Sequence, residues 1–250
     1  PGERDDVNML FRHKVHVLCR KEELDHERLE GKVAIVLDVL FATSTIITAL
    51  ANGVTEVIPT LDEAGARDEA QKHPLGSYVL AGELYAETLP GFASPTPLAL
   101  LEENIAGRKL IYSTTNGTVA LRQSSRADHV YAGALLNGEA LVNRVLDRHP
   151  GKTIVIVCSG SMGMVNLEDL YGAGYFVDLL SRALDEDSDF SDAALAVRSL
   201  FRGEDAADCL LRARVGRLMV ERNLAHEVHF AARLSALDAV PVLAGGRLLA

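Results

Sequence analysis

Four short polar stretches of this 250-residue sequence carry residue types that could perform chemistry. The first contains Asp38, directly after the apolar run 33–37, and the second contains Glu83, which opens a proline-rich loop. The third and fourth are 113–118 and 158–163, each between an apolar run and a helical pattern. Carboxylates at such positions can bind a divalent cation or attack phosphorus. Hydroxyls and free backbone N–H groups there can hold an anion.

Each candidate also has a purely structural explanation. Asp38 can cap the turn that follows it, and Glu83 can be a solvated loop residue. Glu168 lies in the first turn of a helical pattern, where a carboxylate suits the helix dipole. Asp169 follows a good N-cap residue by three positions, as in a capping box. Cys158 ends an apolar run and can be a small buried hydrophobe.

Apolar runs alternate with helical patterns, and these elements must position the polar stretches. Strands are expected at 15–19, 33–37, 54–59, 78–81, 109–113, 129–131 and 153–158. Helices are expected at 45–52, 62–73, 118–123, 139–148 and 167–184. The alternation predicts a layered α/β/α fold, with helices on both faces of a mixed, largely parallel sheet. Because ligands of such sheets bind beyond the carboxyl ends of the strands, the polar stretches should meet there.

The pattern changes after residue 184. The acidic run 185–187 predicts a solvated linker, and 191–234 predicts three helices with little strand signal. A last strand or hairpin is expected within 240–249. We interpret the mostly helical segment around 185–236 as packed on the core of a single domain that spans 1–250.

Composition excludes several classes of protein. Lys and Arg total 25 against 35 Asp and Glu, which gives a net charge of −10, and no basic run predicts nucleic-acid binding. No apolar run approaches the roughly 20 residues that span a bilayer, and the start 1–6 is polar, unlike a signal peptide. Three widely spaced cysteines form no disulfide framework, so we expect a cytoplasmic protein. A homodimer is expected because two-fold homo-oligomers are common.

Common catalytic motifs are missing from the sequence. Neither a dinucleotide fingerprint, a P-loop, an H-E-x-x-H pair nor a G-x-S-x-G elbow occurs. None of the eight histidines has a recognisable metal-binding spacing. Haloacid-dehalogenase-type chemistry needs Asp-x-Asp, and Leu40 stands where the second Asp would be.

In their order and spacing, the polar stretches resemble the ComB-type 2-phosphosulfolactate phosphatases over about residues 15–249. The matching segments are 37–45, 49–53, 82–83, 91–95, 114–118, 158–160, 167–169, 172–174 and 239–242. The resemblance implies a layered α/β fold and a Mg²⁺-dependent phosphatase. Its substrate would be the phosphate ester of a small sulfonated hydroxy acid, in a step of coenzyme M biosynthesis.

The resemblance also implies a role for each stretch. Asp38, Glu83 and Glu168 become Mg²⁺ ligands, with the nucleophile as an alternative role for Asp38. The catalytic candidates are Asp38, Glu168 and Cys158. The residues expected to hold the oxyanions of the substrate are Thr43, Thr114, Thr115, Asn116, Gly117, Thr118, Ser159 and Gly160.

Two positions and one segment depart from the family pattern. Phe41 and Leu84 stand where family members generally carry arginine, and the shortened segment 91–95 lacks an Asp. Losing a charge-assisted hydrogen bond costs about 1.5–3 kcal/mol. We therefore expect retained Mg²⁺ binding with an altered or weakened substrate preference. The alternatives are a phosphatase for another small phosphorylated acid and a non-catalytic protein that binds an anionic metabolite.

Overall fold

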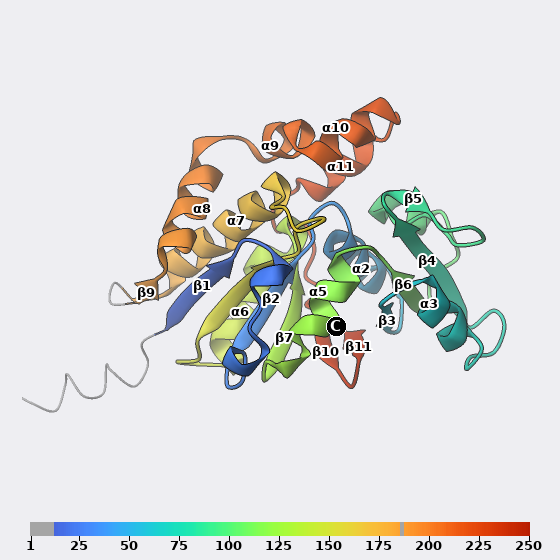
Figure 1. Cartoon of the computed structure of the whole chain (residues 1–250), viewed down its shortest axis with the longest axis horizontal. Coiled ribbons are helices and arrows are strands. Elements are labelled where there is room, and N and C mark those ends of the chain that lie inside the picture. The colour runs from blue at the N-terminus through green and yellow to red at the C-terminus, as the bar shows by residue number, and fades with distance from the viewer. Residues whose placement is uncertain (1–12, 186–187) are drawn as a thin grey trace, which may run out of the picture.

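The computed structural model describes residues 13–185 and 188–250, and Figure 1 shows their arrangement. A sheet forms the middle layer and helices cover both of its faces. The predicted layered α/β architecture with a mixed, largely parallel sheet is confirmed. The polar start 1–6 and residues 186–187 of the expected acidic linker lie outside the described residues.

In the described chain, the sheet has two parallel halves joined by a hairpin. One half contains β1 (Lys14–Leu18), β2 (Val33–Leu37), β7 (His129–Gly133), β8 (Ile154–Cys158) and β9 (Asp189–Phe190). The other contains β3 (Val57–Thr60), β4 (Tyr78–Leu84) and β6 (Lys109–Ser113), with β5 (Glu87–Thr88) antiparallel at its edge. The hairpin of β10 (Val242–Ala244) and β11 (Arg247–Leu249) was expected, and it lies between the halves.

Strand direction reverses between the two halves of the sheet. Three antiparallel pairings in succession, β7 with β10, β10 with β11 and β11 with β3, separate them. In Figure 1 the arrows of β1 and β4 accordingly point toward the centre of the molecule from opposite sides. Antiparallel pairing alone would place the carboxyl ends of the two halves at opposite edges of a flat sheet, but because the strands converge in Figure 1, residues that follow strands of both halves can meet at one place.

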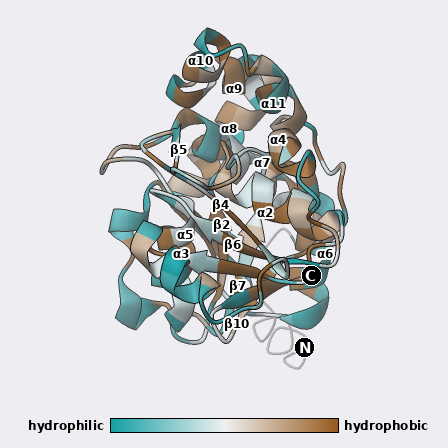
Figure 2. Cartoon of the chain, turned by 90° about the vertical axis from the view of Figure 1, so that its right-hand side faces the viewer, coloured by the Kyte–Doolittle hydropathy of each residue, from teal (hydrophilic) through white to brown (hydrophobic). Residues whose placement is uncertain are grey.

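Strand β2 is buried on both faces because all of its residues are apolar. Val33, Ile35 and Leu37 pack with α6 and α7 on one face, and Ala34 and Val36 pack with α2 and α5 on the other. Figure 2 shows the resulting hydrophobic interior around the central strands. The α-helices in the described part of the chain up to residue 183 are α2 (Ala42–Ala51), α3 (Glu63–Ala70), α4 (Pro97–Leu101), α5 (Gly117–Gln123), α6 (Gly138–Arg148) and α7 (Leu167–Ala183).

Four helices, rather than the expected three, follow α7 in the described chain. They are α8 (Asp192–Gly203), α9 (Ala206–Arg212), α10 (Arg214–Glu221) and α11 (Ala225–Ala231). The extra boundary falls at Ala213, whose backbone is extended, and Gly216 then packs so tightly on the Leu210 carbonyl that no Cβ fits. Figure 1 shows α9, α10 and α11 above the sheet. Neither these helices nor the others in the described residues are long and apolar enough to cross a membrane.

One buried carboxylate attaches the helical segment to the rest of the fold. Glu227 of α11 accepts hydrogen bonds from the Thr96 hydroxyl at 2.7 Å and from the N–H groups of Leu98 and Ala99 at 2.8 Å. These bonds satisfy free N–H groups at the start of α4. The assignment of the whole chain to one domain stays a prediction.

Candidate active site

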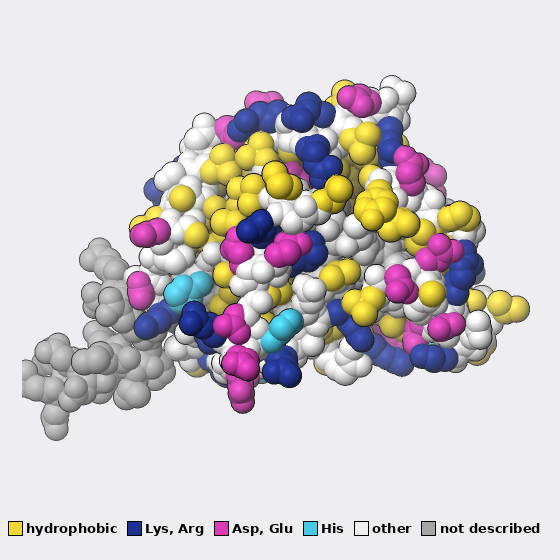
Figure 3. Space-filling view, viewed as in Figure 1, with side chains coloured by type: hydrophobic (Ala, Val, Ile, Leu, Met, Phe, Trp, Pro, Cys, Tyr) yellow, Lys and Arg dark blue, Asp and Glu magenta, His cyan; other side chains and the backbone are white. Residues whose placement is uncertain are grey.

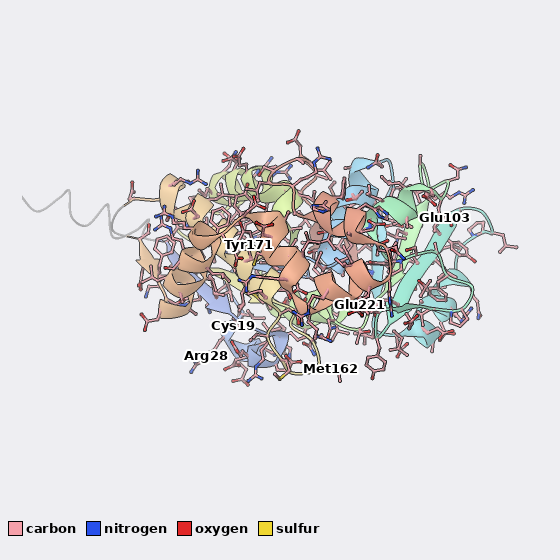
Figure 4. All side chains as sticks on the ribbon, turned by 90° about the horizontal axis from the view of Figure 1, so that it is seen from above. Cys19, Arg28, Glu103, Met162, Tyr171 and Glu221 are labelled. Atoms are coloured by element: carbon pink, nitrogen blue, oxygen red, sulfur yellow. The ribbon has the colours of Figure 1, made fainter. Side chains whose placement is uncertain are left out.

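A cavity of about 480 Å³ lies where polar loops of both sheet halves approach α10. Its lining residues come from the segments 38–42, 83–88, 94–96, 112–116, 161–166 and 214–224. Figure 4 looks down on this side and labels Met162 and Glu221, which belong to two of the lining segments. The lining of the cavity thus includes at least one residue from each of the four polar stretches.

Asp38 is a buried carboxyl group in the wall of the cavity, 8% exposed. Thr43 fixes its backbone, because the Thr43 hydroxyl accepts from the Asp38 N–H at 3.0 Å and donates to the Asp38 carbonyl at 2.9 Å. Gly117 packs against its side chain so closely that a Cβ would lie 2.6 Å from Oδ2. Burial, and then the charges of Glu83 and Glu168, raise the pKa of Asp38 to about 7. Such a perturbed carboxyl group in a cavity is typical of cation-binding or proton-transferring sites.

Glu168 is a second buried carboxyl group close to Asp38. It is 1% exposed, and its Oε1 has no hydrogen-bond partner among the described residues. Burial raises the pKa of Glu168 to about 7, although the Arg214 guanidinium opposes this shift. A buried polar atom without a partner is costly in a native protein and indicates a missing ion, water or ligand.

Asp169 joins the two loops that follow β2 and β8. Its Oδ1 accepts from the Val39 N–H at 2.9 Å, and its Oδ2 accepts from the Gly160 N–H at 3.1 Å. The capping-box interpretation of Asp169 is therefore wrong, and the side chain of Asn166 makes no cap hydrogen bond either. Burial, and then the charges of Asp38 and Glu168, raise the pKa of Asp169 well above its usual range.

Glu83 uses both carboxylate oxygens to hold neighbouring loops. Its Oε1 accepts from the Thr115 N–H at 2.5 Å. Its Oε2 accepts from the Thr115 hydroxyl at 3.0 Å and from the Ala86 N–H at 2.7 Å. Glu83 lines the cavity, but these contacts make it a residue that positions Thr115.

The loop between β6 and α5 presents Thr114, Thr115 and Asn116 to the cavity. Behind them, Thr118 closes the loop by reciprocal bonds: its N–H donates to the Thr114 hydroxyl, and its own hydroxyl accepts from the Thr114 N–H, both at 3.1 Å. The loop is thus rigid, and its free donor is the side-chain amide of Asn116, whose N–H groups donate to no described residue and can bind oxygen atoms of an anion.

Five of the eight residues expected to hold oxyanions lie behind the cavity wall: Thr43, Gly117, Thr118, Ser159 and Gly160. Backbone groups of this set hold neighbouring segments together: the Ser159 N–H donates to the Leu37 carbonyl at 2.8 Å, and the Gly160 N–H donates to Asp169. The buried Ser159 hydroxyl has no hydrogen-bond partner among the described residues. These residues shape the loops, and Ser161 lines the cavity in place of Ser159.

Cys158 lies in the hydrophobic core beside α7. Its thiol is buried and donates to the Asp169 carbonyl at 3.5 Å. Burial, and then the charge of Asp169, raise the pKa of the Cys158 thiol well above its usual range, which favours the neutral thiol over the reactive thiolate. The location agrees with the packing explanation, and we assign no catalytic role to Cys158.

Lys21, which the sequence analysis did not single out, connects two of the polar loops. Its Nζ donates to Asn116 Oδ1 at 2.9 Å and to the Ser159 carbonyl at 3.2 Å. The lysine lies just beyond the end of β1, in the short 3₁₀ turn Lys21–Glu23. A polar residue after the first expected strand is the signal that could have identified it.

Helix α10 and the residue just past its end supply the arginines of the cavity, and this too was missed. Arg214, Arg217 and Arg222 line it, whereas the apolar Phe41 forms part of the opposite loop. Leu84 lies outside the cavity and is 51% exposed. Figure 3 shows Lys and Arg side chains gathered over α9 and α10 at the top of the molecule.

The three carboxylates expected to bind a metal ion do not form a three-ligand cluster. Within the part of the chain that the structure describes, no group of three or more His, Cys, Asp or Glu side chains is arranged to hold a metal. Glu83 is engaged with Thr115 and Ala86, which leaves Asp38 and Glu168. Because Mg²⁺ is usually bound by one or two carboxylates, with waters and substrate oxygens as further ligands, this pair fits Mg²⁺.

The two raised pKa values predict how stability depends on pH in the absence of divalent cations. Asp38 and Glu168, with pKa values of about 7, hold protons in the folded protein that the unfolded chain releases near its ordinary carboxyl pKa of about 4. The folded state therefore binds more protons between these values, and the free energy of unfolding will fall as pH rises from about 4 to about 7.

Denaturant titrations in EDTA across this pH range measure the effect, and Glu168→Gln should make the curve flatter. A free energy of unfolding that rises with pH over the same range, or a Glu168→Gln curve as steep as that of the wild type, would contradict this prediction.

The fold and the cavity define a layered α/β protein with a polar cavity beyond the strand ends. The family model described as 2-phosphosulpholactate phosphatase matches residues 18–246, and the chain belongs to this family. A relative from Symbiobacterium thermophilum, named probable 2-phosphosulfolactate phosphatase, is 37% identical over 226 residues, which cover 89% of this chain and 96% of the relative. A relative with the same name from Clostridium beijerinckii is 28% identical over 94% of this chain and 98% of its own length. Another from Clostridium perfringens is 35% identical over 78% of this chain and 78% of its own length.

Proposed function

We propose that this protein hydrolyses 2-phosphosulfolactate to sulfolactate and phosphate. Its membership of the family and the names of its relatives support this substrate. The observation that carries the proposal is the shared cavity, which combines the carboxyl group of Asp38, the rigid loop 114–116 and the arginines of α10. A phosphorylated acid needs this combination, because phosphoryl transfer depends on positioning and on neutralising negative charge.

We further propose that Asp38 and Glu168 would hold Mg²⁺. When bound, the cation would neutralise charge on the phosphoryl oxygens. Asn116 would orient the phosphoryl group by hydrogen bonds from its side-chain amide, and Thr114 and Thr115, whose own donors are used by Thr118 and Glu83, would fix the shape of the loop. Glu83 keeps Thr115 in place, and Lys21 does the same for Asn116.

Phosphate release from 2-phosphosulfolactate and neighbouring phosphoacids, with Mg²⁺ and with EDTA, tests the proposal. We expect Mg²⁺-dependent release that is fastest on the sulfonate and lost in EDTA. Release only from other phosphoacids would assign a different substrate to the same chemistry. Binding of the phosphoacids without release from any of them would favour the anion-binding alternative.

The remaining expectations are proposals of the same kind. We propose a cytoplasmic homodimer that participates in coenzyme M biosynthesis and binds neither nucleic acid nor membrane. The cysteines in the described residues, Cys19, Cys158 and Cys209, are all free thiols, as a reducing compartment requires. Light scattering of the purified protein would measure the oligomeric state.

A further inference from the structure

Helix α10 covers the cavity and is fixed at both of its ends by arginine side chains. At its start, Arg214 Nη2 donates to the Ser161 hydroxyl at 2.8 Å. Just past its end, Arg222 donates to the Ala86 carbonyl and forms an ion pair with Glu87. The helix is therefore attached to the loop after β8 and to the hairpin between β4 and β5.

The three arginines differ in how many of their donors the protein uses. The charge of Arg222 is compensated by Glu87. Arg217, between the two attachments, donates to the Arg212 carbonyl, and Arg214 donates to Ser161. Neither Arg214 nor Arg217 forms an ion pair with any residue that the structure describes. Because each guanidinium has five N–H donors, both retain positive charge and several donors for a ligand.

The lining of the cavity therefore combines two chemically different kinds of group. The carboxyl group of Asp38 and the loop 114–116 suit a phosphoryl group with its cation. Arg214 and Arg217 suit carboxylate and sulfonate groups, because a guanidinium binds such oxyanions through two parallel hydrogen bonds. A simple phosphomonoester carries no acid group for these arginines to bind.

We propose that Arg214 and Arg217 bind the carboxylate and sulfonate groups of the substrate and so select phosphorylated acids over simple phosphomonoesters. The proposal rests on the proposed phosphatase function for the identity of the substrate. Arg214 and Arg217 are both exposed and line the cavity, so a ligand can reach their guanidinium groups from solvent.

Calorimetric binding of sulfolactate, which lacks the phosphoryl group, tests the arginines independently of turnover. We expect Arg214→Gln and Arg217→Gln each to weaken the binding of sulfolactate about tenfold to a hundredfold, because each variant loses a charge-assisted hydrogen bond. Arg144→Gln removes the same charge from the exposed side of α6, outside the cavity, and should leave the affinity unchanged. Equal affinities in all variants, or no binding of millimolar sulfolactate by the wild type, would overturn the proposal.

Kinetics provide a second readout. In each cavity variant, the ratio of kcat/KM for 2-phosphosulfolactate to kcat/KM for p-nitrophenyl phosphate should fall at least about tenfold, chiefly through KM. An unchanged ratio would mean that the arginines do not distinguish acids from simple esters. Failure of the phosphatase function has a different signature, in which sulfolactate binding depends on the arginines but no phosphate is released.

Discussion

Asp38→Asn will lower kcat for Mg²⁺-dependent phosphate release by about a thousandfold or more, while the protein remains folded. Asparagine keeps the shape of the side chain but removes the negative charge that a cation requires. Because burial already favours the protonated form of Asp38, whose pKa is about 7, the neutral amide should not destabilise the fold. Initial rates of phosphate release and the thermal midpoint, measured on the same preparation, give both quantities.

A control variant separates this effect from a general loss of charge. Asp147 lies on α6, and its side chain is 79% exposed, so Asp147→Asn should retain wild-type rates and stability. An Asp38→Asn variant with near-normal turnover would remove Asp38 from the mechanism. An Asp38→Asn variant that does not fold would instead indicate a structural role for the carboxylate.

Gly117→Ala is the second substitution with a large expected effect. The new methyl group would lie 2.6 Å from Asp38 Oδ2 and even closer to the Cβ of Ala42, so the loop after β6 or the start of α2 must move. We expect the free energy of unfolding to fall by about 1–3 kcal/mol, as for other overpacked sites. We expect kcat/KM to fall about a hundredfold, because displacements of about 1 Å have effects of this size on catalysis.

Gly203→Ala is the matched control, because a Cβ at this position of α8 meets no atom within 4 Å. It should change stability by less than about 1 kcal/mol and leave the rate unaltered. Denaturant unfolding and steady-state kinetics of both variants measure the comparison. If Gly117→Ala matched this control in both assays, the close packing of Asp38 against α5 would have no functional importance.

The arginines of α10 change the expectation drawn from Phe41 and Leu84. The absence of arginine at these two positions predicted weakened binding of the acid groups. Phe41 does line the cavity, but Leu84 lies outside it, and Arg214 and Arg217 bring positive charge to the same cavity from the helical segment. Under the proposed role of these arginines, the preference for a phosphorylated acid would depend on a part of the chain that sequence analysis treated only as a helical cover.

The sequence by itself determined the layered fold and most of its strands, although β5 and β9 were not expected. Apolar runs such as 33–37 and 109–113 predicted β2 and β6 with their observed bounds, because burial on both faces requires continuous apolar residues. Asp38 and the loop 114–116 were predicted at the site because polar groups after buried strands meet beyond the sheet.

Only the tertiary structure decided what each polar group contacts. Asp169 and Val39 are 130 residues apart in the chain, and Lys21 and Asn116 are 95 apart, so no local pattern could predict their hydrogen bonds. The role of Arg217 likewise depends on how α10 packs over the sheet. Local residue types fix strands and helices, whereas the distances between distant side chains follow from the packing of the complete fold.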